Sequence, residues 1–416
     1  MDGNDSAFAP HIEPLAQAGA APAEVVVAQT AQGTVIALDA ASGGPLWRWV
    51  THDPRASIAR AGERIFVISA LSDRPIWVEL DPPPRLPEGI VGRHANAVSL
   101  THTRTRPAAV TALRASDGAV LWRVPFYCSA ISPSASAGIS VADDTLLTTA
   151  LSFERGVSEL LALDCATGAP RWSYSIGPLP LATTSVQPMV IWAEMGKVAV
   201  LTLVGPHEET RFVTLDAMTG AVLWQGEQAP QHDEAVQENE TSGIRFTTDY
   251  ALKWPHHILR ATRIDSGADV WQMALDDLSG ARSVETSVLA ADGRLHLFWR
   301  AEGRIRLRTV RATTGQDLWR WRSPTWLYAL FLARQAIWRG QQAAQTRSWR
   351  PLVGDALHFR WLHPIRLAGV SSVMAANGRL YLATPLGVFA INARNGRSLW
   401  HALSFIAVKW LHAAVQ

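Results

Sequence analysis

The sequence lacks features that mark several common protein classes. It has only 2 cysteines in 416 residues. Cys128 and Cys165 are too few and too far apart for a disulfide scaffold, a CxxC redox pair or a cysteine zinc site, although the two thiols can be free or paired. No apolar run approaches the ~20 residues that span a bilayer, and residues 1–24 lack the basic segment and apolar run of a secretory signal. We therefore expect no transmembrane segment, and the compartment stays open.

Charge and motif content exclude further classes. The 38 basic and 36 acidic residues nearly balance, and the basic residues are interspersed along the chain. This pattern argues against a dedicated nucleic-acid or membrane-surface protein. HExxH, GxSxG and P-loop patterns are absent, so no catalytic residue is predicted.

Tryptophan, in contrast, is abundant, with 18 residues, and a repeated motif accounts for seven of them. The stretch VIALDAASGGPLWRW at residues 35–49 recurs, with variations, six more times. In every copy a Gly precedes the Trp by four residues, and a small Ala or Thr precedes it by ten. Such repetition predicts one repeat domain with a shared core. The motif residues are Gly43, Gly118, Gly168, Gly220, Gly267, Gly315 and Gly396, followed by Trp47, Trp122, Trp172, Trp224, Trp271, Trp319 and Trp400.

The spacing of these tryptophans indicates the size of the unit. The central steps lie near 50 residues, which suits four strands with short turns. The longer first step contains a Pro-rich stretch, residues 72–107, which we interpret as a loop inserted into one unit. The long last step contains strand-like runs ending near Trp361, which predicts a degenerate eighth unit without the motif glycine.

Hairpin signals define the order of strands within a unit. Turns such as ADG at residues 291–293 and ANG at residues 376–378 precede strand-like runs, and Asp-Gly and Asn-Gly favour tight hairpins. Each unit therefore reads as strand A, tight turn, strand B, variable loop, strand C, glycine turn and strand D with the Trp. We predict an all-β chain forming a single β-propeller of four-stranded antiparallel blades, eight in number, with seven clear and one degenerate.

The same pattern predicts domain bounds and a binding face. Residues 1–23 are expected to be a flexible segment and residues 24–416 the propeller. The first strong strand, residues 24–30, resembles a strand B, and residues 404–412 are expected to supply the missing strand A. Long segments fall in the B–C and D–A connections, which favours a binding site on that face. The alternative, that these loops are tolerated insertions, is equally open.

The pattern of small residue, acidic residue, Thr-Gly and Trp resembles the tryptophan-docking repeat of the pyrroloquinoline-quinone (PQQ) propeller superfamily. The resemblance covers about residues 24–410 and implies that each Trp, Trp361 included, packs between the Ala of its own motif and the peptide at the Gly of a neighbouring blade. A small residue leaves a slot for the indole and Gly exposes a flat peptide, so the motif residues are expected to be structural. A WD-type propeller is a weaker alternative, because its Trp-Asp pair is absent.

Quinoprotein enzymes of this superfamily bind the quinone with Ca²⁺ or a lanthanide and stack it on a ring made by two adjacent cysteines. Cys128 and Cys165 are not adjacent, so that ring is absent. The acidic stretch of residues 232–240 could offer oxygen ligands to a hard cation through Asp233, Glu234, Glu238 and Glu240. It lacks the DxDxDG spacing, so a solvated acidic loop is favoured.

Two functional hypotheses remain. The first is a non-catalytic propeller that binds a protein or peptide partner through its loop face, as the short propellers resembling outer-membrane-assembly scaffolds do. The sequence shows neither the signal nor the lipid-anchor cysteine of that group, which weighs against membership in it. The second is a small PQQ-dependent oxidoreductase with Ca²⁺. We expect the first, with no cofactor, no nucleic acid and a monomeric chain.

Overall fold

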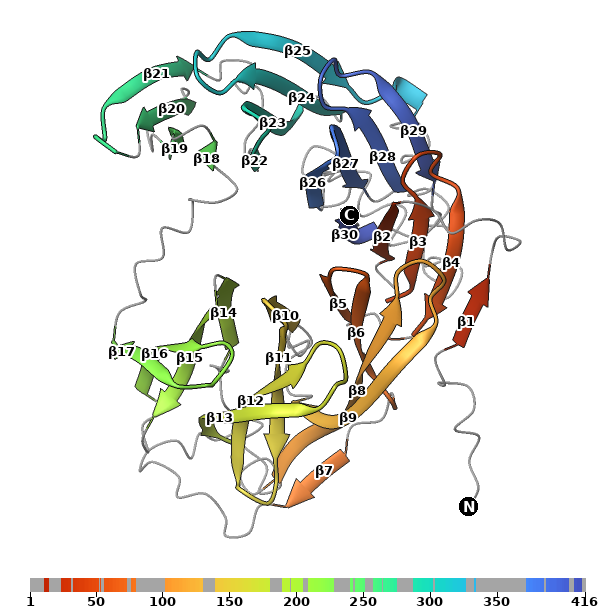
Figure 1. Cartoon of the computed structure of the whole chain (residues 1–416), viewed down its shortest axis with the longest axis vertical. Helices are drawn as coiled ribbons and strands as arrows, with labels where there is room; N and C mark the ends of the chain where they lie inside the picture. The colour runs from red at the N-terminus through yellow and green to blue at the C-terminus, as the bar shows by residue number, and fades with distance from the viewer. Residues whose placement is uncertain are drawn as a thin grey trace, which may run out of the picture. The chain divides into compact units, whose positions relative to one another are not determined.

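The described part of the computed structural model is built almost entirely of β-strands (Figure 1). Two compact units are distinguished. The first comprises Met1–His232 with His412–Gln416, and the second comprises Asp233–Leu411. The structure describes residues 11–14, 24–30, 33–51, 53, 56–72, 76–79, 102–129, 139–179, 189–194, 196–204, 209–227, 240–241, 244–250, 257–263, 265–274, 287–301, 304–326, 333, 372–384, 387–403 and 408–413.

The first unit contains four antiparallel sheets. The first sheet has the order β1-β4-β3-β2-β30, and in the second β9 pairs with β8 beside the path β5-β6-β8-β7. The third and fourth sheets follow chain order. The strands are β1 (His11–Pro14), β2 (Val25–Thr30), β3 (Val35–Asp39), β4 (Pro45–Val50), β5 (Ser57–Ala61), β6 (Arg64–Ala70), β7 (Ile76–Glu79), β8 (His102–Arg114), β9 (Val120–Ser129), β10 (Ile139–Ala142), β11 (Thr145–Ser152), β12 (Val157–Asp164), β13 (Pro170–Pro178), β14 (Met189–Glu194), β15 (Lys197–Val204), β16 (Glu209–Asp216) and β17 (Val222–Gly226). The last strand, β30 (Val408–Ala413), has residues in both units.

The second unit contains three antiparallel sheets, the fifth to the seventh, each with its strands in chain order. Their strands are β18 (Glu240–Thr241), β19 (Ile244–Tyr250), β20 (His257–Arg263), β21 (Asp269–Ala274), β22 (Ser287–Ala291), β23 (Arg294–Ala301), β24 (Arg304–Arg311), β25 (Asp317–Arg322), β26 (Ser372–Ala376), β27 (Arg379–Thr384), β28 (Gly387–Asn392) and β29 (Ser398–Leu403). The all-β prediction of repeated four-stranded sheets is confirmed.

Burial follows the place of a strand within its sheet. The second strands are almost continuously apolar and buried, as in RLYLAT of β27 and RIFVISA of β6, because sheets pack on both of their faces. The outer strand β9 instead alternates between exposed and partly buried side chains. Apolar clusters therefore lie between successive sheets within each unit.

The turns are uniform at one end of the sheets. Every A–B turn between sequential strands has two residues and every C–D turn has five. Asp143, Asp292 and Asn377 adopt positive φ in the A–B turns, a conformation that Asp and Asn tolerate better than other side chains. The hairpins predicted from ADG and ANG are confirmed.

Three further expectations concern single segments of the chain. The N-terminal segment is not irregular throughout, because His11–Pro14 forms β1 and pairs with β4. The Pro-rich stretch 72–107 contains β7 and the start of β8, which pair with each other. Residues 327–340 and 354–366, with Trp361, lie outside the described residues apart from residue 333.

The sixth and seventh sheets are direct neighbours in the structure. One apolar cluster joins Phe298, Leu307 and Trp321 of the sixth sheet to Leu380 and Phe389 of the seventh. The expectation that an eighth blade ending near Trp361 separates these sheets is therefore wrong. The total number of blades stays a prediction, because seven sheets are found in the described part of the chain.

Candidate functional site

The motif tryptophans have a common position within their own sheets. Each stands on strand D of its repeat, directly opposite the small residue on strand C, where little side chain blocks the indole. The pairs are Trp47 with Ala37, Trp122 with Ala112, Trp172 with Ala162, Trp224 with Thr214, Trp271 with Ala261, Trp319 with Thr309 and Trp400 with Ala390.

Five of these indoles also contact the next repeat. The indole N–H of Trp47 donates to the carbonyl of Ala115 at 2.9 Å, and that of Trp319 donates to Ala393 at 3.1 Å. Equivalent bonds join Trp122 to Cys165, Trp172 to Ala217 and Trp271 to Ala312, at 3.2, 3.0 and 2.8 Å.

The motif glycines lie beneath these rings. A Cβ at Gly168 would lie 2.7 Å from Cδ2 of Trp122, and one at Gly396 would lie 2.4 Å from Cε3 of Trp319. Comparable contacts arise at Gly118, Gly220 and Gly315. These five glycines also have positive φ, so a side chain there meets both an unfavourable backbone conformation and an indole ring.

A third residue completes the surroundings of several tryptophans. It stands on strand B, opposite the small residue, and is aromatic in three sheets. Ring centroids are 5.6 Å apart for Phe66 and Trp122, 5.8 Å for Phe246 and Trp271, and 5.9 Å for Tyr381 and Trp400. These are favourable separations for aromatic pairs.

In the sixth sheet this position is occupied by His296. Its ring centroid lies 6.0 Å from that of Trp319, and its Nδ1 is 2.8 Å from Oγ1 of Thr309. Only 1% of its surface is exposed. Burial, with a contribution from the charge of Arg294, lowers the pKa of His296 from 6.5 to about 4, because an imidazolium loses its hydration there.

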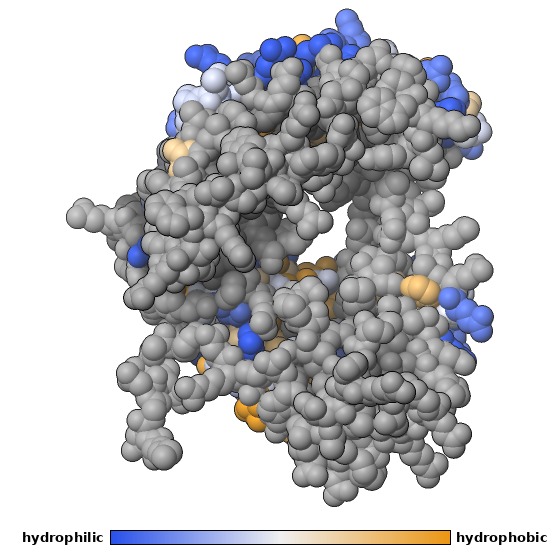
Figure 2. All heavy atoms as spheres, turned by 180° about the vertical axis from the view of Figure 1, so that it is seen from behind, coloured by the Kyte–Doolittle hydropathy of each residue, from blue (hydrophilic) through white to orange (hydrophobic). Residues whose placement is uncertain are grey.

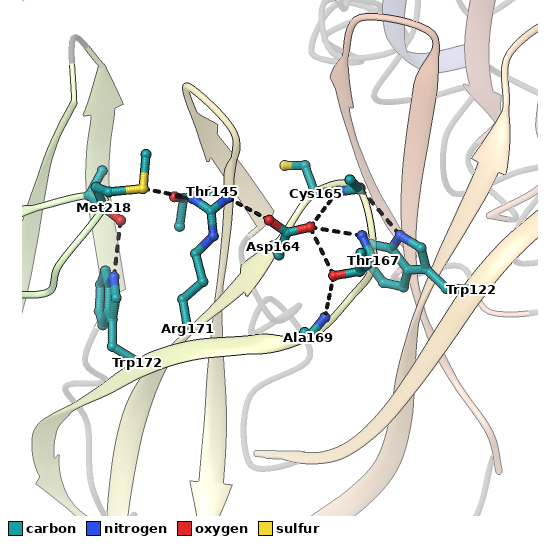
Figure 3. Close-up of polar contacts among 11 residues, drawn as sticks. Trp122, Thr145, Asp164, Cys165, Thr167, Ala169, Arg171, Trp172 and Met218 are labelled. Atoms are coloured by element: carbon teal, nitrogen blue, oxygen red, sulfur yellow. Dashed lines mark hydrogen bonds and ion pairs between the residues drawn. The ribbon is translucent and has the colours of Figure 1, made fainter.

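Figure 3 shows how the C–D turn of the third sheet is fixed. One carboxylate oxygen of Asp164 accepts hydrogen bonds from the backbone N–H of Ala166 and from both the N–H and the hydroxyl of Thr167. Its other oxygen accepts from Arg171, which also donates to Thr145. The guanidinium of Arg171, followed by the Thr167 bonds, holds the pKa of Asp164 at about 2. These bonds hold the turn that carries Gly168 under Trp122.

The two cysteines form no disulfide. Cys165 is 2% exposed, and burial raises the pKa of its thiol to about 11. Its carbonyl receives the Trp122 indole N–H, so Cys165 has a packing position in the C–D turn. Cys128 is partly exposed on β9.

The weak metal candidates are not brought together in the described structure. Asp233, Glu234 and Glu238 lie outside the described residues, and Glu240 is described only as the first residue of β18. Among the described residues, no group of three or more His, Cys, Asp or Glu side chains could share a metal ion.

Four predicted docking residues belong to terminal repeats of the two units. Trp224, Trp400, Gly43 and Gly267 stand at the ends of the two units, where the next repeat in order belongs to the other unit. Their docking stays a prediction.

One docking residue was missed by motif reading. Trp321, two residues after Trp319, is buried, and its indole N–H donates to Ser398 of the seventh sheet at 2.9 Å. Its ring also lies 6.3 Å from that of Phe389. The doubled LWRW pattern, which the first repeat shares, was the signal that could have revealed it.

Repeated four-stranded sheets with this Gly-to-Trp spacing define a β-propeller of the PQQ-like repeat class. The model of the family described as outer membrane protein assembly factor BamB matches residues 106–320, just over half of the chain. The chain belongs to this family.

Similar solved structures span several kinds of protein. BamB from Moraxella catarrhalis is 15% identical, with 95% of this chain and 88% of that chain covered and a TM-score of 0.32. A europium-containing methanol dehydrogenase is 10% identical, with 94% and 81% covered and a TM-score of 0.32. The β-propeller domain of the trilobed protease from Pyrococcus furiosus is 9% identical, with 80% of each chain covered and a TM-score of 0.31. No curated protein matches the sequence significantly.

Within the described residues of the chain, no helix is long and apolar enough to cross a bilayer.

Proposed function

We propose that the chain is a non-catalytic binding or scaffold module whose protein or peptide partner docks at the end of the sheets that carries the B–C and D–A connections. The family to which the chain belongs is described by an assembly factor, which supports a role in holding other proteins. The proposal also assigns a purely structural role to the motif tryptophans and glycines.

The observation that carries this proposal is the distribution of connection lengths. The A–B and C–D turns do not vary, with two and five residues throughout the sequential strands. The intervals at the other end vary from residues 302–303, between β23 and β24, to residues 323–371, between β25 and β26. Because a rigid framework usually carries function on its variable connections, this end is the favoured place for a partner.

At the end of the sheets that carries the A–B and C–D turns, polar groups and glycines already make contacts within the fold. Asp164 and Asp216 direct their carboxylates to the N–H groups of their own turns, and the glycines there support indoles of neighbouring repeats. Carboxylates that already accept hydrogen bonds within their turn are less available to a partner. This supports the opposite end of the sheets as the binding face.

Site-specific cross-linking tests this choice of face within a single sheet. A photo-reactive residue at Glu154, exposed between β11 and β12, is compared with one at Ala166, exposed in the turn between β12 and β13. We expect the Glu154 position to give discrete partner adducts in cells and the Ala166 position to give none. Adducts of equal yield from both positions would overturn the assignment of the face.

The alternative function, a PQQ-dependent oxidoreductase, has a direct test. Carboxylate oxygens are common Ca²⁺ ligands, and among the described residues no group of three or more His, Cys, Asp or Glu side chains could hold a metal ion. Titration with PQQ plus Ca²⁺, followed by melting temperature and a dye-linked alcohol oxidation assay, should show no saturable stabilisation. A raised melting temperature with dye reduction would replace the scaffold proposal with the enzyme.

A further inference from the structure

The sulfur of Met218 lies beside a guanidinium group. Met218 is in the C–D turn of the fourth sheet and Arg171 stands on β13 of the third sheet, both in the first unit. Nη1 of Arg171 is 3.0 Å from Sδ of Met218, and Figure 3 shows the two side chains turned toward one another. A thioether is only a weak hydrogen-bond acceptor, so the charged donor has a poor partner in this contact.

Other contacts fix the position of the guanidinium. Arg171 donates through Nη2 to the carboxylate of Asp164, and its Nη1 also donates to Oγ1 of Thr145 at 2.7 Å. Only 20% of the Arg171 side chain is exposed. The donor is therefore held in front of the sulfur by interactions that do not involve Met218.

The other repeats show that the fold does not require this pair. The residue directly before the motif Trp is Arg only in the third repeat, and in the others it is Leu46, Leu121, Leu223, Val270, Leu318 or Leu399. The residue two positions before the motif Gly is Met only in the fourth repeat, and in the others it is Ala41, Ser116, Ala166, Asp265, Thr313 or Arg394. The two exceptions contact each other between one pair of sheets.

Met218 is accessible to small solutes. Its exposed fraction is 52%, whereas Met273 and Met374 are partly buried. Exposure alone does not distinguish Met218, because hydrophobic side chains are visible in small separate patches on the face shown in Figure 2, as is normal for folded proteins. The distinguishing feature is an exposed sulfur beside a cationic donor that is already held in place.

We propose that Met218 is a site of reversible oxidation by hydrogen peroxide, at which the sulfoxide oxygen accepts a hydrogen bond from Arg171 and strengthens the contact between the third and fourth sheets. A lone pair of the sulfur forms a bond to one peroxide oxygen while the O–O bond breaks. The sulfur loses two electrons, and the other oxygen leaves as hydroxide and takes the proton of the first. The products are the sulfoxide and water, and reductases return the sulfoxide to the thioether.

The consequence of this oxidation differs from the usual one. Oxidation of methionine commonly disrupts packing, because a flexible apolar side chain becomes polar. The side chain of Met218 is half exposed, and its three rotatable bonds allow the new oxygen to turn toward Nη1 of Arg171. Because a hydrogen bond from a charged donor is stronger than one between neutral groups, the two sheets should hold together more firmly. This inference goes beyond the proposed binding function and concerns the opposite end of the sheets.

Oxidation of the whole chain with hydrogen peroxide, followed by peptide mapping with mass spectrometry, measures the rate at each methionine. We expect Met218 to be oxidised severalfold faster than Met273 and Met374. The oxidised chain should melt about 2 to 4 °C above the reduced chain, as for one added hydrogen bond in a large domain. Met218→Leu controls for oxidation at the other methionines and should show no rise.

Arg171→Leu tests the donor, since Leu is the common residue at this place in the other repeats. Comparing the oxidised and reduced forms of the same variant separates the oxidation effect from the lost contact with Asp164. We expect Met218 to be oxidised in this variant without a rise in melting temperature. An equal rise in Arg171→Leu would overturn the proposal. Complete oxidation of Met218 in the unchanged chain without a rise, or oxidation no faster than that of Met273, would overturn it as well.

Discussion

Trp47 offers the sharpest test of the contacts between repeats. It is 1% exposed, donates its N–H to Ala115 and covers Gly118 of the second sheet. Truncation of a buried Trp to Ala typically costs about 3 to 5 kcal/mol. The lost N–H also leaves the Ala115 carbonyl without this donor, which costs about 1 to 3 kcal/mol more. We therefore expect Trp47→Ala to lower the free energy of unfolding by about 4 to 8 kcal/mol.

Urea unfolding followed by circular dichroism measures this loss without relying on the remaining tryptophans. Trp47→Phe keeps most of the apolar area and removes the donor, so its loss should be intermediate. Trp326→Ala removes an indole that is 42% exposed and serves as the control, with an expected change below about 1 kcal/mol. A loss for Trp47→Ala no larger than that of the control would refute the argument that these indoles hold successive sheets together.

Three further outcomes are expected. Gly118→Ala should lower the melting temperature, because its Cβ would meet Trp47 at 2.9 Å in a backbone conformation with φ of +74°; an unchanged melting curve would contradict this. Trp271→Ala should lower the melting temperature less than Trp47→Ala, since Trp271 is only partly buried, and the reverse order would count against burial as the cause. His296 has a folded-state pKa of about 4, below the ordinary 6.5, so the unfolded chain binds more protons between these values. The contribution of His296 to the free energy of unfolding is therefore full above pH 6.5 and falls as the pH drops towards 4. His296→Phe should flatten this pH dependence. If the free energy of unfolding changed equally between pH 7 and pH 5 in the variant and the unchanged chain, the assignment would be contradicted.

Much of each sheet could be predicted from local chemistry. The Asp292-Gly293 and Asn377-Gly378 turns are formed as predicted, because Asp, Asn and Gly tolerate positive φ better than other residues do. The small residue ten positions before each Trp stands opposite it for a similarly local reason, since a fixed five-residue turn sets the register. The position of His296 beneath Trp319 was not predicted, because a residue on strand B has no fixed sequence spacing to the Trp.

Sequence by itself determined the strands, the turns and the repeated slot for an indole, since alternation, turn chemistry and side-chain size act over a few residues. Only the tertiary structure decided which repeat each indole meets. Trp319 contacts Ala393 across 74 positions, past the runs interpreted as an eighth blade, because apolar packing selects neighbours by shape and not by distance along the chain. The pairing of β24 with β25 likewise places Arg308 opposite Arg320 and Arg306 opposite Arg322, side chains that are 12 and 16 positions apart in the sequence.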